Sequence, residues 1–158
     1  ANIGFILIGF ALGKEGIAAA IFYTVVYAFT SIAVFGLLIA WTSKSYEIDK
    51  IKDLSGLGKY SAGLAFILLI VMFSMAGIPP FIGFWSKLAI IKEVVAQGYT
   101  EMALTMVIFA VTAAFYYLQI IRVMYFDNYK DKLIDNSDTG FKIALFINVV
   151  VLIVIGLQ

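Results

Sequence analysis

Lys87 is the residue of this chain whose surroundings most favour chemistry. It lies within residues 60–97, a long apolar segment, and its near neighbours Trp85, Leu88 and Ala89 are apolar too. A lysine inside the hydrocarbon zone of a membrane costs roughly 3 kcal/mol or more unless it is hydrated or paired. Its amine can bind and release a proton. We therefore predict that Lys87 is a proton-relay residue.

The helix must break shortly before this lysine. Pro79 and Pro80 lack amide donors and clash with the preceding helical turn, and a residue before a proline leaves the helical region. Together with Gly77 and Gly83 they predict a helix break over residues 76–82. Broken backbone at membrane depth is tolerated only against protein or a watery cavity. A broken helix beside an ionisable residue is also the form that ion sites take in transporters.

The composition excludes most other chemistry. The 158 residues include no Cys, which excludes disulfides, thiolate nucleophiles, iron–sulfur clusters and thiolate zinc sites. They include no His, which excludes ordinary haem ligation and His-based triads. The formal net charge of +1 is too small for a nucleic-acid-binding surface. We expect this chain to bind no cofactor, metal or nucleic acid itself.

The distribution of apolar residues predicts an all-α fold, a polytopic transmembrane helical bundle with one proline-broken helix. Hydrophobic residues make up 63% of the chain and charged residues 13%, which leaves too little polar surface for a soluble globule. A spanning helix needs about 20 mostly apolar residues. We expect one transmembrane domain over 1–158, a fragment of a larger protein, with spans at about 2–12 (truncated), 17–42, 60–97, 102–126 and 142–158.

The broken segment 60–97 could cross the membrane once, or twice as a tight hairpin. As one span, it places the polar loops 43–59 and 127–141 on the same side. These loops and their flanks carry most of the lysines, so the positive-inside rule makes that side cytoplasmic. A hairpin would put the two loops on opposite sides, and the charge bias would largely vanish. We favour one broken span.

Simpler roles exist for each of these polar residues. Lys87 could reach to the membrane interface, or form a salt bridge that serves assembly alone. Hydroxyl groups in two other spans could line a hydrated path: Tyr23, Tyr27, Thr112, Tyr116 and Tyr117. Such hydroxyls more often bond to the backbone or to a neighbouring helix.

Three runs of the sequence resemble a known family. Residues 74–87, SMAGIPPFIGFWSK, are similar to the S-L-A-G-I-P-P-x-x-G-F-x-x-K segment of the antiporter-like membrane subunits of respiratory complex I and of Mrp-type cation/proton antiporters. Residues 53–58, DLSGLG, resemble the D-L-x-G-L loop of the subunit N type of complex I. Residues 114–127, AFYYLQIIRVMYFD, are similar to the A-[FY]-Y-Y-L-R-x-x-[KR]-x-M-Y-F-D run of the same type. The resemblance covers essentially the whole chain and places it in the C-terminal third or so of that subunit.

The resemblance implies a fold and a role. Such subunits have about 14 helices in inverted repeats, and Lys87 would match the ionisable residue of the broken helix in the second half-channel. The implied function is proton translocation in NADH:quinone oxidoreductase, where quinone reduction elsewhere in the complex drives proton transfer through a hydrated channel using Lys87. NADH, FMN, iron–sulfur clusters and quinone would belong to other parts of the complex. The implied partners are the antiporter-like subunit M, small subunits such as K, and the lipid bilayer, in the bacterial inner membrane rather than the mitochondrial one.

The sequence also departs from the family pattern. Gln119 stands where an arginine is common, and Tyr60-Ser61 stands where a proline often starts the broken helix. The charged residues of the family's first half-channel lie outside this chain, so we expect that the chain alone neither pumps nor catalyses. Two alternatives stay open: an Mrp-type antiporter subunit without a redox partner, and a structural or assembly subunit in which Lys87 has no relay role.

Overall fold

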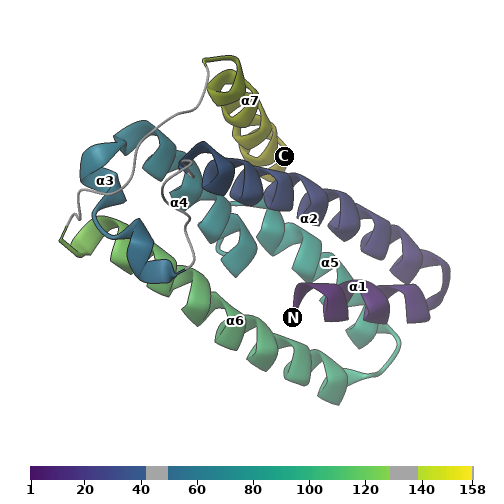
Figure 1. Cartoon of the computed structure of the whole chain (residues 1–158). Helices are drawn as coiled ribbons and strands as arrows, with labels where there is room; N and C mark the ends of the chain where they lie inside the picture. Colours follow the sequence, from purple (N-terminus) through teal and green to yellow (C-terminus); the bar gives the residue numbers. More distant parts are fainter. Residues whose placement is uncertain (42–49, 129–138, 158) are drawn as a thin grey trace.

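The computed structural model describes residues 1–41, 50–128 and 139–157, and these ranges form helices without a strand (Figure 1). The helices are α1 (Asn2–Ala11), α2 (Gly13–Trp41), the short 3-10 helix η1 (Ile51–Leu54), α3 (Leu57–Tyr60), α4 (Ala62–Ala76), α5 (Ile82–Ala96), α6 (Thr100–Phe126) and α7 (Thr139–Gly156). Of these described helices, α2, α6 and α7 are long and apolar enough to cross a membrane. The all-α class predicted from the sequence is confirmed.

The proline-broken helix consists of α4 and α5. Helix α4 ends at Ala76 and α5 begins at Ile82, so residues 77–81 form the break. Each half has 15 residues, which makes it about 22 Å long at the helical rise of 1.5 Å per residue. The hydrocarbon core of a bilayer is about 30 Å thick. One half alone is therefore too short to span the hydrocarbon core, whereas the two halves together are long enough.

Hydrogen bonds between segments show which ends of the helices meet. The amide of Gly56, between η1 and α3, donates to the carbonyl of Val123 near the end of α6, with an N···O distance of 3.3 Å. At the other end of α4–α5, the side-chain amide of Gln97 donates to the carbonyl of Leu12. The chain before α4 therefore lies beside the end of α6, and the chain after α5 lies beside the turn between α1 and α2.

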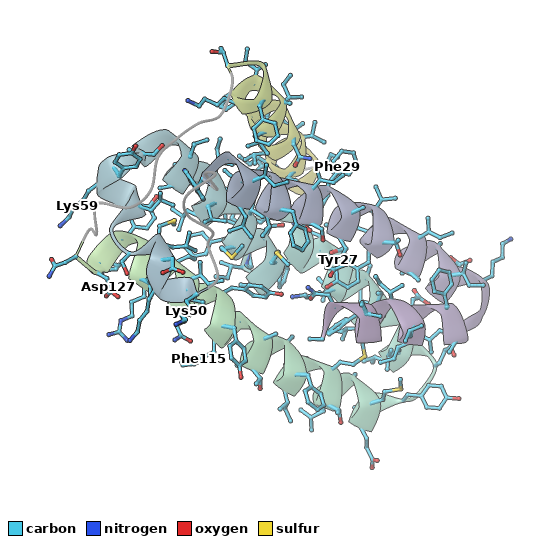
Figure 2. All side chains as sticks on the ribbon, in the orientation of Figure 1. Tyr27, Phe29, Lys50, Lys59, Phe115 and Asp127 are labelled. Carbon is cyan, nitrogen blue, oxygen red and sulfur yellow. The ribbon has the colours of Figure 1, made fainter. Side chains whose placement is uncertain are left out.

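The two halves follow one another in the same direction, which is the arrangement that the prediction of one broken span requires. In Figure 1, α4 and α5 run in one direction through the bundle, and α2 and α6 run in the opposite direction. Figure 2 shows Lys50, Lys59 and Asp127 gathered at the end of the bundle where α6 ends. A hairpin of α4 and α5 would have put Lys50 and Lys59 at the opposite end from Asp127.

Two glycines allow α1 to fold back closely along α2. A Cβ atom on Gly9 would lie 2.8 Å from the Cβ of Ala20, and a Cβ on Gly16 would lie 2.6 Å from the carbonyl oxygen of Gly9. Both distances are too short for real side chains. Small residues let helix backbones approach each other where no hydrophobic effect drives them together. The pair holds α1 against the rest of the bundle and so fixes the position of Asn2 at its start.

The buried side chains form two clusters. The larger is centred on α4 and includes Leu37, Trp41, Leu57, Leu68, Val71 and Met124. The smaller joins α1, α2, α5 and α6 and includes Phe5, Tyr23, Ile90, Val94 and Met106. In contrast, α6 exposes large apolar side chains along its outer face, among them Leu104, Ile108, Val111 and Phe115. A membrane span presents such a face to lipid or to another helix.

Candidate functional site in the broken helix

The last turn of α4 ends in a glycine that reverses the chain. Gly77 has φ +79°, in the left-handed region that favours glycine. The amide of Ile78 donates to the carbonyl of Phe73 at 3.1 Å, and the amide of Gly77 donates to that of Ser74 at 3.0 Å. This pair of bonds is a Schellman motif. It satisfies two of the carbonyls that the end of a helix leaves without an intrahelical donor.

The next carbonyl, that of Met75, is bound by Lys87. In a continuous helix it would accept a bond from the amide of residue 79, but Pro79 has no N–H. The Nζ of Lys87 donates to this oxygen at 2.7 Å instead. The lysine is only 6% exposed. Because the C-terminal end of a helix carries partial negative charge, the end of α4 stabilises a cation at this place.

A pocket of about 330 Å³ opens beside Lys87. Its lining comes from the break, α5 and α6: Ala76, Gly77, Ile78, Phe84, Lys87, Leu88, Ile91, Val107, Ala110, Val111 and Ala114. Among these residues, Lys87 has the only ionisable side chain. An ammonium group has three N–H donors, and Met75 accepts from one of them. One water molecule takes up about 30 Å³ of liquid, so the pocket is large enough to hold water against the lysine.

The start of α5 packs directly against the end of α4. The amide of Gly83 donates to the Oγ of Ser74 at 3.2 Å, and a Cβ on Gly83 would lie 1.8 Å from the Ser74 carbonyl oxygen. Ser74 is fully buried. Its hydroxyl thus satisfies one of the first amides of α5, which have no acceptor within their own helix. This contact sets the two half-helices so that Lys87 reaches back to Met75.

The end of α7 rests on the break from another side. The indole Nε1 of Trp85 donates to the carbonyl of Gly156 at 2.9 Å. A Cβ on Gly156 would lie 2.6 Å from the amide nitrogen of Ile82 and 3.0 Å from the carbonyl oxygen of Pro80. Figure 1 shows α7 standing out from the bundle, with its C-terminal end beside α2. Helix α7 therefore contacts the break itself.

The structure brings together two of the predicted hydroxyl residues through a third residue. The hydroxyl of Tyr23, on α2, donates to the Oδ1 of Asn2, on α1, at 2.9 Å. The Nδ2 of Asn2 donates to the hydroxyl of Tyr117, on α6, at 3.2 Å. Tyr27, one turn along α2 from Tyr23, is half-buried and extends toward the middle of the bundle (Figure 2). Asn2 thus joins hydroxyls from two other helices.

Thr112 and Tyr116 lie apart from this group. The hydroxyl of Thr112 donates to the carbonyl of Ile108 in its own helix at 2.9 Å, and Tyr116 is 59% exposed. Neither residue lines the pocket beside Lys87. A channel-lining role for all five hydroxyl residues stays a prediction.

Sequence reasoning missed three residues of the site: Asn2, Ser74 and Trp85. A sequence signal could have found Asn2 and Ser74. Asn2 is the only amide in an apolar run without charges, and such a group needs a partner inside a membrane. Ser74 lies in the last turn before the predicted break, where freed backbone groups need polar partners. The role of Trp85 depends on α7, which is distant in the sequence.

Known proteins share both the sequence and the fold. Residues 1–116 match the family model described as NADH:quinone oxidoreductase/Mrp antiporter, TM. The chain is 47% identical over 131 residues to the NADH-quinone oxidoreductase subunit N of Hydrogenovibrio crunogenus. The aligned region covers 82% of this chain and 27% of the relative. It is 44% identical over 158 residues to the protein of the same name from Acidithiobacillus ferrooxidans, which covers 99% of this chain and 33% of the relative. The chain therefore spans about a third of the length of these curated relatives.

A solved structure shows the same fold. A chain in the structure titled respiratory complex I from Thermus thermophilus with bound aureothin matches with a TM-score of 0.85 and 21% sequence identity. The match covers 98% of this chain and 35% of that chain. The resemblance to antiporter-like subunits, first noted in the motif around the break, is thus confirmed in sequence and in fold. This multi-pass membrane chain belongs to the NADH:quinone oxidoreductase/Mrp antiporter transmembrane family.

Proposed function

We propose that this chain is part of subunit N of NADH:quinone oxidoreductase, and that Lys87 carries protons through the membrane there. The similarity to relatives of that name over nearly the whole chain supports the first part. The observation that carries the second part is the buried Lys87 amine on the Met75 carbonyl, at the break and beside a pocket. In this proposal, quinone reduction elsewhere in the complex drives the proton transfer, and the activity belongs to the whole complex.

In this proposal Lys87 has two states. When protonated, its ammonium donates to Met75 and is stabilised by the end of α4. Water in the pocket can take a proton from one of its other N–H groups, because the Lys87 side chain is part of the pocket lining. The neutral amine keeps a lone pair that can accept the next proton. The break supplies the carbonyl and the space that an unbroken helix would lack.

The redox groups and the partners of the complex follow from the same proposal. NADH, FMN, iron–sulfur clusters and quinone would bind to other parts, since this chain has neither Cys nor His to hold a cluster. The exposed apolar face of α6 offers a surface for lipid and for neighbouring membrane subunits, such as M and K. The relatives named above are bacterial, which supports a place in the bacterial inner membrane.

The test uses the full-length subunit in the assembled complex in its native membranes. Lys87→Ala removes the amine, Lys87→Arg keeps a charge, and Lys92→Ala removes an exposed lysine from the same helix as a matched control. We expect Lys87→Ala to lose most proton pumping per quinone reduced, Lys87→Arg to retain part, and Lys92→Ala to behave like the parent. Proton uptake and NADH-driven quinone reduction are measured on membranes with equal amounts of complex.

Each alternative has its own outcome. Normal pumping by Lys87→Ala in an assembled complex would refute the relay. A structural role would be favoured if Lys87→Ala prevents assembly and every variant complex that does assemble pumps fully. Cation/proton exchange that needs this protein, without any NADH-driven activity that depends on it, would favour an Mrp-type antiporter.

A further inference from the structure

Asn2 connects three helices that are far apart in the sequence. It begins α1, and its side chain bonds to Tyr23 on α2 and to Tyr117 on α6. Tyr23 is only 3% exposed, and Asn2 and Tyr117 are half-buried. The bridge lies next to the apolar cluster of Phe5, Ile90 and Met106. Polar groups in such surroundings are costly unless they are bonded.

The bridge has a fixed direction. The O–H of Tyr23 points to Oδ1 of Asn2, and the N–H of Asn2 points to the oxygen of Tyr117. A phenol has one hydrogen to donate. Tyr23 has already given its hydrogen to Asn2, whereas Tyr117 is an acceptor here and keeps its own hydrogen for another group. Asn2 therefore leaves the Tyr117 hydroxyl as the free donor at the end of this series of hydrogen bonds.

Tyr117 stands on the side of α6 that faces the Lys87 pocket. Ala110 and Ala114 on α6 line that pocket. Tyr117 follows Ala110 by seven residues and Ala114 by three, and such spacings fall on one face of a helix. Apart from Lys87, every residue lining the pocket has an apolar side chain or none. The hydroxyl of Tyr117 is therefore the next polar side-chain group along this face of α6.

We infer that Asn2 is a positioning residue for proton transfer: it holds the Tyr117 hydroxyl as a hydrogen-bond donor at the edge of the Lys87 pocket, where that hydroxyl orders the water that exchanges protons with the lysine. This inference rests on the proposed function of Lys87. Asn2 does not itself take up the proton, because an amide side chain does not ionise in this range of pH. It acts through Tyr117, and Tyr23 fixes the amide from its other side.

The test is a double-mutant cycle in the full-length subunit of the assembled complex. Asn2→Leu removes both bonds at similar size, Tyr117→Phe removes only the hydroxyl, and Asn2→Leu/Tyr117→Phe combines them. Tyr99→Phe is the control, since Tyr99 is an exposed tyrosine just before α6 that does not line the pocket. The measurement is proton pumping per quinone reduced, on membranes that contain equal amounts of complex.

If Asn2 acts through Tyr117, each single variant lowers pumping about fivefold, the factor expected from one lost hydrogen bond, and the double variant is no lower than Tyr117→Phe. Tyr99→Phe pumps like the parent. Normal pumping by Asn2→Leu overturns the inference, and so does a double variant whose loss is the product of the two single losses.

Two further results keep the tests separate. If Asn2→Leu does not assemble, Tyr23→Phe replaces it in the cycle, because it frees the amide of Asn2 and keeps every ring in place; the same two outcomes then decide. If Lys87→Ala pumps normally, the proposed function itself fails. If Lys87→Ala abolishes pumping and Asn2→Leu pumps like the parent, only the inference on Asn2 fails.

Discussion

A side chain at position 83 would collide with the backbone of α4. The Cβ of an alanine there would lie 1.8 Å from the carbonyl oxygen of Ser74, and a backbone atom has little freedom to move away. We expect Gly83→Ala to separate the two half-helices and to destabilise the subunit by more than the ~1–3 kcal/mol typical of an overpacked core. The measurement is the thermal unfolding of the purified complex in detergent, together with its yield.

Gly63 provides the matched control. It lies in the same broken helix, on α4, it is exposed, and a Cβ there would meet no atom within 4 Å. Alanine is favoured over glycine within a helix by about 0.5–1 kcal/mol, so Gly63→Ala should leave the melting temperature unchanged or raise it slightly. Equal melting temperatures for the two variants would contradict the packing described for Gly83.

For single residues, the sequence predicts which side chains stand out chemically better than it predicts their hydrogen-bond partners. The two prolines, Gly77 and Gly83 indicate the break, because their backbone constraints are local. The lysine stands out because its neighbours are apolar. The lysine bonds to the Met75 carbonyl, and Asn2 and Ser74 bond to groups on other helices. These bonds depend on how the helices pack together, which a single sequence does not show.

At the scale of elements, α7 is the helix whose contact with the break can be tested most directly. Gly156→Ala would push the end of α7 away from Ile82 and Pro80 and would break the bond from Trp85. If this contact holds the break in its pumping geometry, pumping per quinone should fall about two- to fivefold while the complex still assembles, as for the loss of one hydrogen bond. Pumping and quinone reduction are measured on the same membranes.

Gly4→Ala is the control for this change, since a Cβ on this glycine of α1 would meet nothing within 4 Å. It should pump like the parent. Unchanged pumping by Gly156→Ala would show that the end of α7 packs on the break without affecting its function.

The element boundaries show what a hydropathy pattern can predict. Helix α6 ends at Phe126, directly before polar residues. Helix α2 begins at Gly13 rather than at residue 17, because Lys14 and Glu15 fit into its exposed first turn. Similarly, α7 begins at Thr139 rather than at residue 142. Charged residues end an apolar run in the sequence, but they do not end a helix.

At the scale of the whole molecule, the two polar ends of the bundle can be told apart by chemical labelling. The chain itself has no cysteine, so single cysteines can be introduced into a full-length protein whose other cysteines have been replaced. Lys50 and Asp127, to be replaced in Lys50→Cys and Asp127→Cys, lie at one end (Figure 2). Lys14, to be replaced in Lys14→Cys, is in the first turn of α2 at the other end, where Gln97 bonds to Leu12. We expect a membrane-impermeant thiol reagent to label the first two from the same side of sealed vesicles and the third only from the opposite side.

This experiment also tests the lysine count that favoured one broken span. Labelling of Lys50→Cys and Asp127→Cys from opposite sides would mean that α4 and α5 form a hairpin, against the arrangement of the helices. Labelling from the cytoplasmic side would support the orientation that the positive-inside rule predicts. The sequence predicts the cytoplasmic side from charge alone, whereas the packing of α4 and α5 against α2 and α6 places Lys50 and Asp127 at the same end of the bundle.

The connection between the two half-helices is less rigid than a continuous helix. A continuous helix would link the two halves by one backbone hydrogen bond per residue. Here, among the described residues, the hydrogen bonds that run from α5 back to α4 are those of Gly83 to Ser74 and of Lys87 to Met75. A bond to a charged group contributes about 1.5–3 kcal/mol, and a neutral one about half of that. The bond from Lys87 is therefore one of the two that join α5 to α4, so a change in the charge of this amine would also change how firmly the two halves are held together.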